Sequence, residues 1–219
     1  MKNKPIIALL TDYGLRDGYV ASMKAVISTD FPDANIIDIT HEISSHNIED
    51  AAYILWSAYE YFPQKTIFVS VVDPGVGSKR DIICAQSKKY TFLSPDNGLL
   101  KYIFASEKIL RVVSVTNNKY FNSKISPTFH GRDIFAPVAA NLAKGVSIKV
   151  LGKNINPDTA PVEFIKFENR SSTVIKGKII HIDRFGNIIT NIHVKNFDSL
   201  KYIKNITVAK DYINIFRKT

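Results

Sequence analysis

The chain has 219 residues, of which 45% are hydrophobic, and it carries one cysteine and a formal net charge of +9. This length suffices for one large domain or for a domain with a smaller partner. No apolar stretch reaches the roughly 18 residues that a membrane-spanning helix needs, so we expect no membrane partner. The single cysteine, Cys84, excludes an intrachain disulfide and favours a reducing, cytoplasmic location. It lies in an apolar run, which predicts an unreactive buried thiol.

Most of the excess positive charge lies in the last part of the chain. Residues 171–219 hold nine Lys or Arg against three Asp or Glu, which accounts for +6 of the +9. A basic segment is one feature of nucleic-acid-binding modules. Here the basic residues are spread singly, and aromatic residues do not interleave with them as on a base-stacking surface. We therefore expect a solvated surface and no nucleic-acid partner, with a nucleic-acid-binding module as an alternative.

Short apolar runs alternate with helical patterns through the first 145 residues. The longest helical pattern has apolar residues at helical spacing and begins at Asn47, which can cap an N-terminus. The last helical pattern is followed by Gly145, a residue suited to the position after a helix C-terminus. In chain order, the sequence predicts a strand at 6–10, a helix at 19–28, a strand at 36–39, a helix at 47–61, strands at 66–72, 82–85, 90–93 and 110–115, and a helix from about 132 to 144.

This alternation of strands and helices favours an α/β fold with a mostly parallel sheet covered on both faces. After residue 150 the composition changes, and residues 152–163 contain the Asn, Asp and Pro that are typical of a linker. Beyond it, apolar runs at 174–182 and 188–194 flank a hairpin-like turn, and a last apolar segment covers 206–216. We therefore expect an N-terminal α/β sandwich domain over 1–150, a linker over 151–170 and a smaller C-terminal β domain over 171–219.

Polar residues gather at three places next to predicted elements. Asp12 follows the first strand, Asp73 and Arg80 follow the strand at 66–72, and His130 precedes the last helix. Ligands of open parallel sheets bind beyond the carboxyl ends of the strands, so these four side chains could meet at one edge. Each also has a structural interpretation: a cap or turn for the two aspartates, a solvated charge for the arginine, and a hydrogen-bonded structural residue for the histidine. The residues alone leave both interpretations open.

Two further patterns carry little weight. Residues 75–79 resemble a phosphate-binding loop but lack the GxxxxGK[ST] spacing. The other four histidines show no spacing typical of metal ligands, so we expect no metal site.

Five motifs, in order, give the chain a resemblance to a known family. Together they resemble the S-adenosyl-L-methionine hydrolases, also called SAM hydroxide adenosyltransferases, which are related to the enzymes that make 5′-fluoro- and 5′-chloro-5′-deoxyadenosine. The match extends from residue 5 to about residue 195, and five ordered motifs are far more specific than one. The motifs are TDYGLRDGYVASMKAVI (11–27), VVDPGVGSKR (71–80), PDNGLL (95–100), TFHGRDIFAPVAANLAKG (128–145) and IDRFGNIITNI (182–192).

The resemblance implies an N-terminal α/β domain, a C-terminal β-barrel and a homotrimer. The active sites of such a trimer lie between one subunit's first domain and a neighbour's second domain. The resemblance also implies that S-adenosyl-L-methionine is the substrate and that no cofactor is needed. A water-activating triad falls here on Asp73, Arg80 and His130. The implied substrate-binding positions are Asp12 for the ribose diol, Phe129 for the nucleoside pocket, Asp183 for the methionine end, and Phe185 and Asn187 for the adenine side.

The implied reaction is attack of water or hydroxide on ribose C5′, which gives adenosine and L-methionine. The sulfonium leaves as a neutral thioether, so the leaving group needs no acid, and the difficulty lies with the nucleophile. A cationic Arg80 beside a bound water favours hydroxide-like charge, while Asp73 or His130 can accept the proton. Asp12 suits a vicinal diol because a carboxylate accepts two hydrogen bonds.

Two alternatives stay open within this chemistry. One is a halogenase of the same superfamily, whose fluorinating members have a tyrosine at the position of Asp73 and a serine at that of Gly131. A carboxylate at the nucleophile site repels a halide, which favours water. The other is a protein that binds adenosine or S-adenosyl-L-methionine without catalysis. The resemblance implies a further C-terminal segment that closes the barrel, so if Thr219 is the end of the protein we expect weak binding, a poorly formed barrel or impaired trimerisation.

Overall fold

The computed structural model describes residues 4–156, 177–192, 206–208 and 211–213. By its internal contacts the chain divides into two compact units, Met1–Val162 and Glu163–Thr219. The first unit holds a six-stranded sheet with its helices, and the second holds two pairs of short strands.

The six-stranded sheet of the first unit has the strand order β2-β1-β3-β5-β4-β6. All pairings among β2, β1, β3 and β5 are parallel, whereas β4 is antiparallel to both of its neighbours. The expected mostly parallel sheet is therefore confirmed. Its reversed strand arises because β4 and β5 form a hairpin, in which Ser87 N donates to Tyr90 O at 2.9 Å. The strands are β1 (Ile6–Thr11), β2 (Asn35–Thr40), β3 (Ile67–Val71), β4 (Ile82–Ser87), β5 (Thr91–Pro95) and β6 (Ile109–Ser114).

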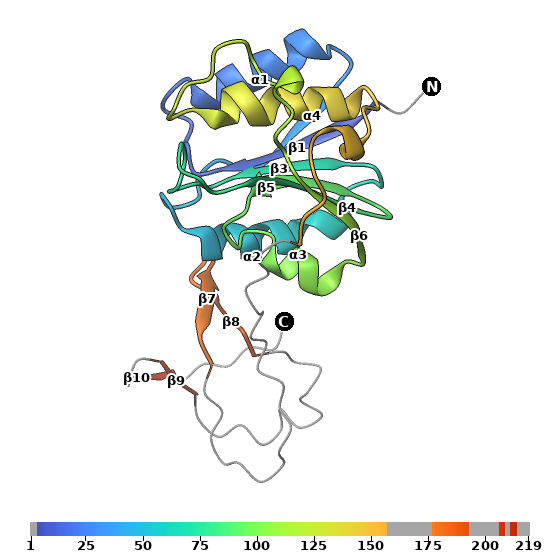
Figure 1. The fold of residues 1–219 in the computed structure, drawn as a ribbon. Helices are drawn as coiled ribbons and strands as arrows, with labels where there is room; N and C mark the ends of the chain where they lie inside the picture. The colour runs from blue at the N-terminus through green and yellow to red at the C-terminus, as the bar shows by residue number, and fades with distance from the viewer. Residues whose placement is uncertain (1–3, 157–176, 193–205, 209–210, 214–219) are drawn as a thin grey trace. The chain divides into compact units, whose positions relative to one another are not determined.

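Helices cover both faces of this sheet (Figure 1), with α1 and α4 packed together on one face and α2 and α3 on the other. Met23 and Phe135 belong to the core on the first face, and Leu55 and Phe68 to the core on the second. Because both faces are covered, successive residues of a central strand are all buried, which explains the unbroken apolar run of β1. The helices are α1 (Tyr19–Asp30), α2 (Ile48–Ala58), α3 (Lys101–Ser106) and α4 (Ala136–Ala143).

Within the described residues, none of the helices has the length and apolar character of a membrane-spanning segment.

The direction of strand addition reverses at β1. The chain passes from β1 through α1 to β2 on one side, and then through α2 to β3 on the other side of β1. Because crossovers between parallel strands are right-handed, these opposite steps place α1 and α2 on opposite faces. Such a switch point opens a crevice beyond the carboxyl ends of its two strands. Asp12 and Asp73 follow β1 and β3, so both lie at this crevice.

Local signals set the helix ends. Asn47 caps α2, since its Oδ1 accepts from Asp50 N at 3.1 Å, as the sequence predicts. Gly145, two residues after the last residue of α4, has a φ of +96°, which glycine adopts without strain. The predicted start near residue 132 is a π-helical turn, Gly131–Phe135, and α4 follows it with Pro137 in its first turn. α3 was not predicted, because six residues are too few to show a helical period.

The beginning of the predicted linker is bound to the sheet. Lys153 O accepts from Ser114 N at 2.9 Å, and Ile155 N donates to Val112 O at 3.1 Å. This segment therefore runs beside the edge strand β6. Residues 157–170 of the predicted linker lie outside the described residues.

The described part of the second unit consists of two antiparallel strand pairs. β7 (Ile179–Ile182) pairs with β8 (Ile188–Thr190), and β9 (Ile206–Val208) pairs with β10 (Asp211–Ile213). The predicted hairpin with its turn at 183–187 is confirmed. The outer ends of the predicted runs, 174–176 and 193–194, lie outside the described residues, and the closed barrel stays a prediction.

Candidate active site

A cavity of about 330 Å³ opens at the switch point of the sheet. Its walls come from the loop after β1, the loop before α2, the end of β3, and the segment that enters the π-helical turn. The structure thus brings Asp12, Asp73, Phe129 and His130 together in one cavity. Its lining also includes Tyr13, Tyr19, Ser45 and His46, none of which the sequence singled out.

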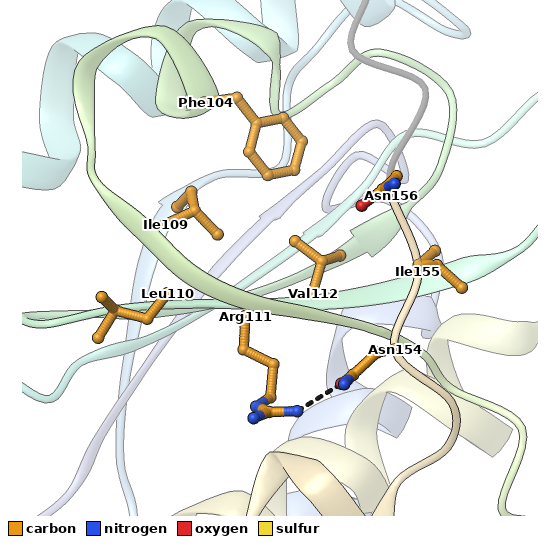
Figure 2. Close-up of a pocket in the computed structure, with 8 residues that line it drawn as sticks. All are labelled: Phe104, Ile109, Leu110, Arg111, Val112, Asn154, Ile155 and Asn156. Atoms are coloured by element: carbon orange, nitrogen blue, oxygen red, sulfur yellow. Dashed lines mark hydrogen bonds between the residues drawn. The ribbon is translucent and has the colours of Figure 1, made fainter.

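A second cavity, of about 380 Å³, lies at the β6 edge of the sheet, between α3, β6 and residues 154–156 (Figure 2). Phe104, Ile109 and Val112 give it an apolar wall. Arg111, the charged residue of its lining, donates to Asn154 Oδ1 at 2.5 Å. Neither a carboxylate nor a histidine is among the residues that line this second cavity, all of which belong to the described range. The smaller cavity at the switch point is therefore the candidate for acid–base chemistry.

Asp73, which lines that cavity, forms a two-point ion pair with Arg80, which is not itself among the lining residues. Arg80 Nε donates to Asp73 Oδ1 at 2.7 Å, and Arg80 Nη2 donates to Oδ2. Gly75 N adds a bond to Oδ1 at 3.2 Å. The side chains of Asp73 and Arg80 are only 5% and 13% exposed, so their charges act on neighbouring groups with little screening by water. The planar fork of arginine fits a carboxylate at two points, which fixes the orientation of both groups.

The loop between these two residues is shaped to reach the segment that carries His130. Gly77 has a φ of +76°, and a Cβ at this position would lie 2.6 Å from Pro127 O. Only glycine combines this left-handed backbone with so close an approach. The 73–80 loop therefore packs directly against the segment before the π-helical turn.

His130 is partly buried, and its Nδ1 is fully buried without a hydrogen-bond partner among the described residues. Burial and the positive charge of Arg80 lower the pKa of His130, although Asp73 and Asp133 act in the opposite direction. The imidazole is therefore neutral at pH 7 and can accept a proton. A buried polar atom that lacks a protein partner is commonly hydrogen-bonded to an ordered water molecule.

Asp133 fixes the segment that leads into His130, and sequence reasoning missed this role. Arg132 donates to it from Nε and Nη2 at 2.7 and 2.9 Å. Ser126 N donates to Oδ2 at 2.8 Å, and Asn122 Nδ2 to Oδ1 at 3.2 Å. These bonds, led by that of Arg132, outweigh the effect of burial and lower the pKa of Asp133 to about 2. The residue is 1% exposed, and its carboxylate ties residues 122–126 to the π-helical turn.

Asp12 is held by an unusual backbone conformation at His46. Its Oδ2 accepts from His46 N at 2.9 Å. His46 has a φ of +66°, which is uncommon outside glycine and marks a strained position. This backbone conformation directs the N–H of His46 toward the carboxylate of Asp12. No sequence signal pointed to this contact, because the two residues are 34 positions apart in the chain.

Three aromatic rings give the cavity an apolar wall. The ring of Phe129 lies 5.0 Å from that of Tyr19 and 5.7 Å from that of Tyr13, both edge to face. Burial, followed by the charges of Asp12 and Asp73, raises the pKa of Tyr13, so its hydroxyl stays protonated. A Cβ at Gly131 would lie 2.5 Å from that hydroxyl, so the absence of a side chain at 131 makes room for it.

Asp183, Phe185 and Asn187 belong to the second unit, where they form a turn of their own. Asp183 accepts from the backbone N–H groups of Phe185 and Asn187 at 2.9 and 2.8 Å, and from Asn187 Nδ2 at 2.6 Å. The hydrogen bond from the Asn187 side chain is the main cause that lowers the pKa of Asp183. Phe185 is 89% exposed within the described residues. Asp183 therefore shapes the β7–β8 turn, and the substrate contacts implied for these three residues stay a prediction.

Comparison with known proteins identifies the family. Residues 7–152 match the SAM hydroxide adenosyltransferase N-terminal domain, and residues 177–219 match the C-terminal domain of the same family. The chain belongs to the SAM hydroxide adenosyltransferase family. The resemblance seen in the five sequence motifs is therefore confirmed.

Relatives in this family carry two different names. The chain is 39% identical to the (R)-S-adenosyl-L-methionine hydrolase of Methanocaldococcus jannaschii, over 97% of this chain and 76% of that protein. It is 37% identical to the protein of the same name from Salinispora tropica, over 86% of this chain and 72% of that protein. A fluorinase from Actinoplanes sp. is more distant, at 27% identity over 86% of this chain and 72% of that protein.

Two solved structures show the same fold. An uncharacterised conserved protein from Thermotoga maritima is similar with a TM-score of 0.80 and 38% identity, over 89% of this chain and 74% of the other. A conserved hypothetical protein from Thermus thermophilus is similar with a TM-score of 0.69 and 32% identity, over 86% and 72% of the two chains. This member of the SAM hydroxide adenosyltransferase family thus spans about three quarters of the length of its relatives.

Proposed function

We propose that this chain hydrolyses S-adenosyl-L-methionine. Water attacks ribose C5′, the C5′–S bond breaks with its electron pair going to sulfur, and adenosine and L-methionine leave. One observation carries the proposal: a single cavity is lined by both Asp73 and His130. Arg80 holds the carboxylate of Asp73 in place, and Nδ1 of His130 has no hydrogen-bond partner among the described residues. The hydrolase relatives at 37–39% identity support the same substrate and reaction.

The residues of the cavity, together with Arg80 that pairs with Asp73, supply the activation of water that this reaction needs. The leaving thioether is neutral and needs no acid, so catalysis must raise the nucleophilicity of water. Arg80 stabilises negative charge that develops on the water oxygen, and Asp73 or neutral His130 accepts its proton. After the attack, this proton passes to solvent. Positioned acid–base help of this kind contributes about 10²–10⁴-fold to the rate, and holding water in line with the C5′–S bond adds the effect of proximity.

The substrate-binding roles complete the proposal. Asp12 accepts hydrogen bonds from the two ribose hydroxyls, and Phe129 forms part of the wall against the nucleoside. Asp183 contacts the methionine end, and Phe185 and Asn187 contact the adenine side. These last three act in a homotrimer, in which the second domain of one subunit completes the cavity of its neighbour. The reaction requires no cofactor or metal ion, and we place the enzyme in the cytoplasm.

A halogenase is the second candidate, because fluorinases are among the relatives. Two observations favour water over a halide. Asp73 lines the cavity with a carboxylate, which repels an anionic nucleophile. Gly131 lies so close to the Tyr13 hydroxyl that a serine at this position would need Tyr13 to move.

Product analysis separates these functions. The protein is incubated with S-adenosyl-L-methionine, with and without chloride or fluoride, and the nucleosides are separated by liquid chromatography. We expect adenosine and methionine in equal amounts, at a rate that the halide does not raise. A halogenated deoxyadenosine as the main product would assign the chain to the halogenases. Binding of S-adenosyl-L-methionine without any product would show a binding protein instead.

A further inference from the structure

A chain of polar contacts lies next to the loop that carries Asp12, and the proposed reaction uses none of its members. Thr11 is the last residue of β1, and its Oγ1 lies 2.8 Å from Nδ1 of His41. The other ring nitrogen of His41, Nε2, lies 3.1 Å from Oδ1 of Asp38, close enough for an electrostatic contact although their relative orientation does not form a hydrogen bond. Lys24 on α1 donates to Asp38 Oδ2 at 2.6 Å. The contacts thus connect α1, the end of β2 and the end of β1.

The two central members are buried. Thr11 is 0% exposed and His41 is 3% exposed. Polar side chains at such positions destabilise the fold unless they are hydrogen-bonded, and an apolar pair could fill the same space. A buried polar network instead restricts the segments it joins to one arrangement.

The chemistry of the partners sets which ring nitrogen of His41 carries the proton. The Asp38 carboxylate favours a proton on Nε2 of His41, which leaves Nδ1 as an acceptor for the Thr11 hydroxyl. The oxygen of that hydroxyl can then accept from Tyr13 N, which lies 3.3 Å away. Lys24 donates to the other carboxylate oxygen of Asp38, Oδ2.

His41 also holds the same loop through its backbone. Its carbonyl oxygen accepts from Gly14 N at 2.8 Å. The loop after β1 is therefore held at Tyr13 through Thr11 and at Gly14 through His41. Asp12 lies between Thr11 and Tyr13, so the direction of its carboxylate depends on both attachments.

We propose that Thr11, His41 and Asp38 are positioning residues that hold the loop 12–14 in the geometry that binds substrate. The role of Asp12 toward the ribose diol rests on the proposed function. A loop ordered in advance loses less entropy when substrate binds, so the network acts on substrate affinity. The residues proposed to activate water lie on other segments, the 73–80 loop and the entry to the π-helical turn. Loss of the network therefore raises KM and leaves kcat nearly unchanged.

The substitution Thr11→Val tests this, because it removes the hydroxyl and keeps the branched shape. The matched control is Thr66→Val. Thr66 is 1% exposed and donates from Oγ1 to Pro63 O at 2.7 Å, but it lies at the amino-terminal end of β3, whereas Thr11 ends the neighbouring parallel strand β1 at its carboxyl end. Thr66→Val loses one buried hydrogen bond, and Thr11→Val loses the bond to His41 together with the longer one from Tyr13 N, so both variants lose stability. Only Thr11→Val loses a bond that reaches the Asp12 loop.

We expect Thr11→Val to raise KM for S-adenosyl-L-methionine about tenfold with kcat within about threefold, the size expected when the hydrogen bonds of one buried hydroxyl are lost. Thr66→Val should change neither constant, and Thr11→Ser should restore KM by returning the hydroxyl. An unchanged KM in Thr11→Val, or an equal rise in Thr66→Val, would overturn the inference.

Amide hydrogen exchange on the protein without substrate gives a reading that does not depend on turnover. We expect faster exchange at Tyr13 and Gly14 in Thr11→Val, and wild-type exchange there in Thr11→Ser and Thr66→Val. Wild-type protein that fails to hydrolyse S-adenosyl-L-methionine would refute the proposed function, while the exchange rates would still decide whether the network holds the loop. Unchanged exchange in Thr11→Val would refute the network itself.

Discussion

Two aspartate–arginine pairs lie in or next to the lining of the same cavity, and they differ in how many hydrogen bonds the carboxylate accepts. Asp133 accepts two bonds from Arg132, one from Ser126 N and one from Asn122, which fills the roughly four acceptor sites of a carboxylate. Asp73 accepts two bonds from Arg80 and one from Gly75 N, which leaves about one site open.

The number of free acceptor sites distinguishes a structural carboxylate from one that can react. Both carboxylates are buried and paired with arginine, so neither burial nor charge pairing distinguishes them. Asp133 has no acceptor site left for a ligand, and its bonds tie down its own segment. Asp73 lines the cavity with an acceptor site to spare. The same substitution should therefore lower mainly the activity at Asp73 and mainly the stability at Asp133.

The largest effect is expected from Asp73→Asn. An amide cannot accept a proton from water, and it no longer balances the charge of Arg80. We expect kcat to fall about 10²–10⁴-fold, measured as adenosine release by liquid chromatography. Asp133→Asn, measured in parallel, should keep kcat within about tenfold, because its carboxylate does not contact substrate. A loss below tenfold in Asp73→Asn would remove Asp73 from the reaction.

Asp133→Asn should instead lower stability. The pKa of Asp133 in the folded chain is about 2, below the unfolded value near 3.9, so its charge stabilises the fold at neutral pH. We expect the free energy of unfolding in urea at pH 7 to fall by roughly 2 kcal/mol. The contribution is complete above about pH 4 and is lost as the pH falls toward 2, so wild type and variant should converge in that window. A constant difference down to about pH 2.5 would contradict this origin.

A smaller effect is expected from Gly131→Ala, which adds a methyl group next to the Tyr13 hydroxyl. The new Cβ would lie 2.5 Å from that oxygen and 3.1 Å from Met23 Sδ, so Tyr13 must move. We expect roughly 1 kcal/mol of lost stability, from overpacking, together with a raised KM. Gly18→Ala is the matched control, since a Cβ at Gly18 would meet nothing within 4 Å. Equal behaviour of the two variants would show that the contact between Gly131 and Tyr13 does not shape the cavity.

The smallest effect concerns the titration of His130, which NMR can follow without turnover. Burial and Arg80 lower the pKa of His130, so its midpoint should lie below that of an unperturbed histidine. Removing the charge in Arg80→Gln should raise the pKa, because the opposing effect of Asp73 remains. Arg111→Gln, at the second cavity, should leave the titration unchanged. A midpoint that falls in Arg80→Gln would reverse the proposed electrostatics.

The fold could be predicted from the sequence where a pattern repeats. Alternating apolar runs and helical stripes indicated the mostly parallel sheet, and Asn47 and Gly145 indicated two helix ends. The reversed direction of β4 was missed although the runs at 82–85 and 90–93 are close enough for a hairpin, a signal that was present and unused. α3 has only six residues and no detectable period, so the sequence offered no signal for it.

The candidate site could be predicted where topology alone brings residues together. Asp12 and Asp73 follow the two strands of the switch point, so the rule for open sheets places them at one crevice. The groups that hold these residues could not be predicted. Thr11 and His41 are 30 positions apart, and the bond from His46 to Asp12 spans 34 positions, so only the folded chain joins them.

The most direct test of the proposed reaction is turnover of S-adenosyl-L-methionine in ¹⁸O-labelled water, with the products analysed by mass spectrometry. Attack of water on C5′ places one labelled oxygen in adenosine and none in methionine, and Asp73→Asn should form this labelled product at a greatly reduced rate. Adenosine without label, or label in methionine, would contradict the proposed attack of water on the ribose carbon.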